Sequence, residues 1–115
     1  MEAEEKWLKA SELEKAGMLQ EALKLYLEKA EVEEDPSMAA ISLLSAARCA
    51  IKLKEMERAA ELFGAAGRKY EEVAERVGEE SPNLLEWAYN MALRCYQLAG
   101  DREASERVMS KIRRR

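Results

Sequence analysis

Residues Met56–Val77, which read MERAAELFGAAGRKYEEVAERV, decide the fold. Their apolar side chains recur every three or four positions and therefore form one stripe along a helix. The stripe consists of Ala59, Leu62, Phe63, Ala66, Tyr70, Val73, Ala74 and Val77. Because Gly in a helix interior costs about 1 kcal/mol relative to Ala, we interpret Gly64 and Gly67 as points where another helix approaches closely. The stretch predicts a long mid-chain helix with helical neighbours on both sides.

The same periodicity recurs on both sides of this stretch and predicts five further helices. Their expected ranges are 2–16, 20–33, 36–54, 82–99 and 102–113. The expected N-caps are Asp35, Ser81 and Asp101, and Pro36 and Pro82 suit the first turns of the helices that they begin. The helix at 36–54 is apolar on more than one side, which predicts that it is covered on several sides. The helix at 102–113 is mostly polar, as the end of a stack requires.

Short turns join these helices in pairs, so each pair is expected to form an antiparallel hairpin. No alternation of β-branched residues indicates a strand. The sequence therefore predicts an all-α superhelix of three antiparallel helical hairpins, six helices in all. The hairpins cover about 2–33, 36–77 and 82–113 of a single domain spanning 1–115.

The second helices of the hairpins carry a repeated pattern. Ala22 with Tyr26 four positions later matches Ala59 with Phe63, and Gly17 and Gly100 hold the turn positions of the first and third hairpins, where Lys54 stands in the second. This pattern resembles the tetratricopeptide repeat (TPR). The segment from Ala59 to Tyr70 is also similar to the soluble NSF attachment proteins, a TPR-like group with long helices. The resemblance is degenerate: Ser105 and Leu93 stand where the repeat has small residues, and these repeats are longer than usual.

The resemblance implies a concave face lined by the first helix of each hairpin, where an extended peptide or a partner helix binds. The positions that it assigns to partner binding are Trp7, Leu44, Arg48, Lys52, Asn90, Arg94 and Gln97. Arg48 and Arg94 hold equivalent positions, so an acidic peptide or a C-terminal carboxylate would relieve their mutual repulsion. The alternative is that these arginines are paired with glutamates such as Glu14 or are solvated. The family's usual carboxylate clamp is not present.

The sequence carries little catalytic chemistry. It has no histidine, the commonest general base and metal ligand, and none of the common catalytic or nucleotide-binding motifs. We therefore expect no enzyme activity, cofactor or metal. Cys49 and Cys95 are the only cysteines, and the spacing of stacked hairpins predicts two buried, reduced thiols with no disulfide between them.

The charge and hydropathy of the chain limit the classes of partner and the cellular location that we expect. A net charge of −4 argues against a nucleic-acid binder, and the basic end formed by Lys111, Arg113, Arg114 and Arg115 suits the C-terminus of a helix. No apolar run is long enough to span a bilayer, and the acidic N-terminus differs from a signal peptide. We expect a cytoplasmic protein. Many charged and few amide side chains are typical of thermophiles.

The sequence is compatible with two functions. The first is an adaptor that binds a protein or peptide on the concave face. The alternative is a homo-oligomerising scaffold, in which a homodimer forms through Trp7, Leu8, Val108 and Met109. From the sequence, Trp7 and Trp87 fit either a position in the core or a position in the binding groove.

Overall fold

The computed structural model describes residues 2–114, and within them the chain is all α-helical apart from turns and one short 3₁₀ helix. The elements are α1 (Glu2–Lys15), α2 (Leu19–Val32), α3 (Pro36–Lys52), α4 (Met56–Val77), η1 (Gly78–Glu80), α5 (Pro82–Ala99) and α6 (Arg102–Arg113). The predicted fold class and the six predicted helices are confirmed. Arg115, part of the expected basic end, lies outside the described residues.

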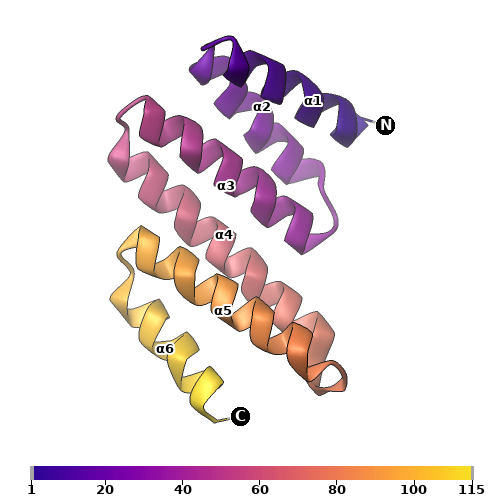
Figure 1. Ribbon diagram of the computed structural model, residues 1–115, viewed down its shortest axis with the longest axis vertical. Helices are drawn as coiled ribbons and strands as arrows, with labels where there is room; N and C mark the ends of the chain where they lie inside the picture. Colours follow the sequence, from indigo (N-terminus) through magenta and orange to yellow (C-terminus); the bar gives the residue numbers. More distant parts are fainter. Residues whose placement is uncertain (1, 115) are drawn as a thin grey trace.

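The helices stack in chain order. Figure 1 shows α1 at one end of the array and α6 at the other, with α1, α3 and α5 running in one direction and α2, α4 and α6 in the opposite direction. Each helix packs mainly against its neighbours in sequence. The array measures 45 × 31 × 17 Å, so the three hairpins form a flat, elongated stack rather than a closed bundle.

Long-range ion pairs show how the stack is layered. Glu14 of α1 contacts Arg48 of α3, and Glu71 of α4 contacts Arg107 of α6. These contacts place alternate helices side by side, so that α1, α3 and α5 form one layer and α2, α4 and α6 form the other. We call the solvent-exposed side of the first layer the odd-helix face.

The core lies between the two layers and is rich in alanine and tyrosine. Among its most deeply buried large side chains are Tyr26, Leu23, Tyr96 and Val108. Helix α3 packs against both α2 and α4, as its apolar sequence predicts, and its alanines are fully buried. Because Val108 is part of this core, the expectation that it belongs to a dimer surface is wrong.

The three hairpins use the same turn. Gly17, Lys54 and Gly100 all have positive φ values, of 81°, 63° and 73°. In each turn the following residue donates its backbone N–H to a carbonyl five positions earlier, as from Met18 to Leu13 at 2.9 Å. This Schellman arrangement satisfies carbonyl groups at the helix end. Lys54 adopts the left-handed conformation that glycine supplies in the other two hairpins, so the equivalence of the three turn positions that the sequence indicates is present in the backbone.

Two of the three predicted N-caps are present. The Asp35 carboxylate accepts a hydrogen bond from the Ser37 backbone N–H at 2.9 Å, and Asp101 accepts one from Ala104 at 3.0 Å. Ser81 makes no side-chain cap bond, so that prediction is wrong. The chain enters α5 directly from η1, and Ser81 has a ψ of 79° rather than the 116° of Asp35. Pro82 does occupy the first turn of α5, as expected.

The two helix-interior glycines of α4 differ. A Cβ atom on Gly67 would lie 2.8 Å from the ring of Tyr96, so the predicted close approach is present there. A Cβ atom on Gly64 would lie 3.7 Å from Arg68 and 3.9 Å from Ala99, which are ordinary contact distances. The interpretation of Gly64 as a point of unusually close approach is therefore wrong.

Candidate functional site

The predicted partner-binding residues lie on the three helices of the odd-helix face. Helix α3 is covered by α2 and α4, and α5 by α4 and α6, so the exposed strips of both helices point away from the second layer. Leu44 is partly buried, and the other six residues, Trp7, Arg48, Lys52, Asn90, Arg94 and Gln97, are exposed. Whether this set binds a partner stays a prediction.

Arg48 is held by an ion-pair cluster around Glu14. Its Nε and Nη2 atoms donate to the two Glu14 carboxylate oxygens at 2.6 and 2.7 Å, and Lys52 Nζ donates at 3.0 Å. The Tyr26 hydroxyl donates to the same carboxylate at 2.9 Å. The alternative that the sequence left open, internal pairing with Glu14, therefore holds for Arg48. For Arg94, the structure shows no ion pair among residues 2–114.

The electrostatics of this cluster follow from its geometry. Hydrogen bonds from Arg48 lower the pKa of Glu14 to about 2; burial acts in the opposite direction, and Lys52 and Tyr26 add to the lowering. Burial, together with the bond to Glu14, raises the pKa of Tyr26 to about 12. At neutral pH the two cations and the one carboxylate leave a net charge of +1, so this part of the face still favours an anion.

The stability of the chain is expected to depend on the ionisation of Glu14. Because its folded pKa lies near 2, below the ordinary value of 4.5, its contribution is fully present above about pH 4.5 and is lost as the pH falls towards 2. Arg48 and Lys52 are half-exposed, so screening reduces the expected contribution to about 1 kcal/mol. Urea unfolding between about pH 6 and about pH 3 should show a steeper loss for the wild type than for Glu14→Gln. Parallel curves would contradict this.

A second cluster of the same composition lies in the other half of the chain. The buried carboxylate of Glu71 accepts hydrogen bonds from Tyr96 at 2.5 Å, Arg107 at 2.6 Å and Lys111 at 3.1 Å. Burial alone would raise the pKa of Glu71, but the hydrogen bonds from Arg107, Tyr96 and Lys111 outweigh it and lower that pKa. Both clusters combine a glutamate, a tyrosine, and an arginine and lysine four positions apart. The expected basic end thus contributes Lys111 to an internal ion pair.

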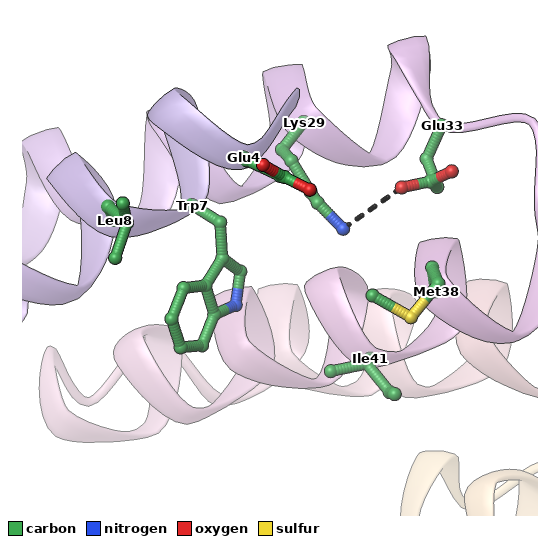
Figure 2. Close-up of a pocket in the computed structure, with 7 residues that line it drawn as sticks. All are labelled: Glu4, Trp7, Leu8, Lys29, Glu33, Met38 and Ile41. Carbon is green, nitrogen blue, oxygen red and sulfur yellow. Dashed lines mark ion pairs between the residues drawn. The ribbon is translucent and has the colours of Figure 1, made fainter. Parts of the chain in front are cut away.

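A hollow of about 480 Å³ lies between α1 and α3. Its lining residues, drawn in Figure 2, are Glu4, Trp7, Leu8, Lys29, Glu33, Met38 and Ile41. Helices α1 and α3 are tied together at Glu14 and diverge towards their N-terminal ends (Figure 1), which opens the hollow. Trp7 and Ile41 are 39% and 43% exposed, so apolar surface faces solvent here.

Lys29 of α2 forms the floor of the hollow and is only 3% exposed. Its Nζ lies 3.2 Å from Glu33 Oε1, within ion-pair distance but without hydrogen-bond geometry. In Figure 2 the ammonium group projects towards Glu33, and the ring of Trp7 lies below it. Apart from Trp7 and Leu8, the sequence assigned no role to the residues of the hollow. The pairing of Lys29 with Glu33 four positions later was its only local signal.

Helix α5 repeats the apolar part of this surface. Leu84 and Trp87 are 47% and 43% exposed, and they follow Met38 and Ile41 by the same 46 positions that separate the turn residues Lys54 and Gly100. The Trp87 ring also meets the buried Tyr70 ring edge to face at a centroid distance of 5.6 Å. We call the exposed large apolar side chains in the N-terminal halves of α1, α3 and α5 the apolar row. It consists of Trp7, Leu8, Met38, Ile41, Leu84 and Trp87.

The two cysteine thiols lie in buried surroundings. Cys49 and Cys95 are free and buried, as the sequence predicts. Burial raises the pKa of Cys95 to about 11 and also raises that of Cys49, so both thiols are protonated at neutral pH. Among the described residues, no group of three or more metal-ligating side chains is placed to hold a metal ion.

The hydropathy of the helices and the comparison of the chain with known proteins give two negative results. Within residues 2–114, every helix is too short or too polar to cross a membrane. No protein-family model, curated protein or solved structure matches the chain.

Proposed function

We propose that the chain is a non-catalytic, cytoplasmic protein-interaction module, an adaptor that binds a segment of a partner protein on the odd-helix face. The observation that carries this proposal is the apolar row. Four of its six members, Trp7, Leu8, Met38 and Ile41, line one hollow, and clustered exposed apolar surface is uncommon on monomeric proteins and marks interaction sites. Tryptophan is enriched among the residues that dominate binding energy, and both tryptophans of the chain belong to the row.

Charged and polar side chains border the apolar row. Asn90, Arg94 and Gln97 are exposed on α5, and the cluster around Arg48 carries a net positive charge. An apolar centre with a polar rim is the usual anatomy of a protein interface. The TPR resemblance supports the same location, because it assigns ligand binding to the first helix of each hairpin.

The function is tested by capture from a lysate of the source organism with matched variants. Trp7→Ala combined with Ile41→Ala removes exposed apolar area, and Arg94→Glu reverses an exposed charge. Lys24→Ala, on the opposite layer, is the control. We expect both odd-helix-face variants to reduce recovery of the captured partner by about tenfold or more, while the control retains it. Equal recovery from all four proteins would refute a role for this face.

The alternative function is a homo-oligomerising scaffold. One observation, the uneven distribution of charge along the chain, supports it. Residues 2–35 contain eleven acidic and five basic side chains, whereas residues 82–115 contain four acidic and seven basic ones. Opposite ends of two copies would therefore attract one another. Light scattering at tens of micromolar separates the alternatives: a monomer excludes the scaffold, and growth in mass that salt reverses supports it.

A further inference from the structure

We propose that the partner segment is an amphipathic α-helix of a second protein. It inserts an apolar side chain into the hollow between α1 and α3, places a basic side chain beside Glu4, and places an acidic side chain beside Arg48 and Lys52. This inference rests on the proposed function and specifies the chemistry of the partner.

The hollow suits an apolar anchor. Its volume of about 480 Å³ falls within the roughly 300–1,000 Å³ of small-ligand sites, so a Leu, Met or Phe side chain fits. Trp7, Met38 and Ile41 supply apolar walls that are each about 40% exposed. Covering them removes apolar surface from water, which is the main driving force of association.

The accessible charge at the hollow is negative. Glu4 is exposed at the rim, and Glu33 stands beside it with about a fifth of its side chain exposed. Lys29, the one cation among the described residues that line the hollow, is buried and already faces Glu33. A carboxylate that approached here would meet two carboxylates, whereas a Lys or Arg of the partner would be attracted.

Positive charge prevails farther along the same face, around Arg48 of α3. Arg48 follows Ile41 by seven residues, which is about 10 Å along α3. Arg48 and Lys52 together exceed the charge of Glu14, and the exposed Arg94 holds the equivalent position on α5. An acidic side chain about two helical turns from the anchor therefore completes the complementarity.

A helix fits this face better than an extended peptide. The face is built from helices whose backbone groups are already hydrogen-bonded, so it offers no strand edge to pair with. An extended peptide laid over the apolar row would lose water from its own N–H and C=O groups without replacing those bonds. A helix satisfies its backbone internally and presents an apolar stripe.

The opposed charges also fix a direction. Acidic residues favour the N-terminal end of a helix and basic residues its C-terminal end. A partner helix with that distribution places its C-terminal end at the hollow, where α1 and α3 begin, and so lies antiparallel to both helices.

The test uses designed helical peptides carrying a fluorescent label. The first has glutamates in its N-terminal half, lysines in its C-terminal half and a leucine stripe. In the second, glutamates replace the lysines, so that reversing its direction cannot restore the match. In the third, alanine replaces the leucine nearest the lysines. Titration with the wild-type chain, followed by anisotropy, should give a Kd at least tenfold lower for the first peptide than for the other two.

Variants of the chain supply the reciprocal test. Glu4→Lys should weaken binding of the first peptide and strengthen binding of the all-acidic second peptide, while Lys24→Ala should leave all three unchanged. The inference is overturned if the first peptide does not bind, if the second binds equally well, or if Glu4→Lys leaves the preference unaltered. Should the lysate capture still depend on Trp7 and Ile41, the interaction module would stand and only this description of its partner would fall.

Discussion

A chain carrying Glu71→Ala is expected to lose about 2 to 3 kcal/mol of unfolding free energy. Glu71 is only 8% exposed, and its carboxylate accepts bonds from Tyr96, Arg107 and Lys111. Its removal leaves the buried Tyr96 hydroxyl without its acceptor and two cations without their counter-ion. Because those cations are one-third to one-half exposed, water partly compensates them, which keeps the loss below the roughly 3 to 5 kcal/mol of a broken, fully buried pair.

The adjacent glutamate provides a matched control. Glu72 lies on the same helix and forms an ion pair with Lys69 at 3.6 Å, with both side chains well exposed. Glu72→Ala should therefore change the unfolding free energy by less than about 0.5 kcal/mol. Urea unfolding followed by circular dichroism measures both variants. Equal losses for the two substitutions would mean that the Glu71 cluster contributes nothing beyond an exposed ion pair.

The two clusters explain how a stack of hairpins holds its layers. Packing between sequence neighbours fixes each hairpin and its contact with the next, but it does not tie alternate helices to each other. Glu14 joins α1 to α3 in one layer, and Glu71 joins α4 to α6 in the other. In both, a tyrosine of the intervening helix donates to the same carboxylate. Each cluster therefore links three helices, and the first lies where α1 and α3 are tied together, away from the hollow.

The sequence predicted the features that depend on local pattern. Helical periodicity located all six helices, and Gly17 and Gly100 marked two turns whose left-handed backbone the structure contains. The repeat also identified Lys54 as the third turn residue, although residues other than glycine disfavour the left-handed conformation that it adopts. The continuous apolar surface of 36–54 predicted a helix covered on several sides. These inferences hold because each depends on only a few consecutive residues.

Features that depend on the angle between helices were not predictable. Glu71 lies next to the apolar stripe of α4, and its sequence neighbours do not distinguish it from Glu72. Arg107 and Lys111, which donate hydrogen bonds to it, come from a helix some 36 to 40 positions later. The hollow likewise needs the divergence of α1 and α3, which no local pattern encodes. Val108 was misassigned for a related reason: α6 turns its thin apolar stripe inward onto α5.

Gly67→Ala is expected to destabilise the chain by about 2 kcal/mol. The new Cβ would lie 2.8 Å from the Tyr96 ring. That ring cannot yield easily, because Tyr96 is 1% exposed and its hydroxyl is bound to Glu71. Overpacking costs up to about 3 kcal/mol, and the better helix propensity of alanine offsets about 1 kcal/mol of it.

Gly64→Ala, one turn earlier on the same helix, should do the reverse. Its new Cβ would meet only Arg68 and Ala99 at ordinary distances, so the helix-propensity gain of up to about 1 kcal/mol remains. The two variants share the same chemical change and the same helix, and their opposite signs would isolate the effect of the Tyr96 ring. Thermal unfolding of both proteins measures the difference. If Gly67→Ala proved as stable as Gly64→Ala, the close approach of α4 and α5 at Tyr96 would be ruled out.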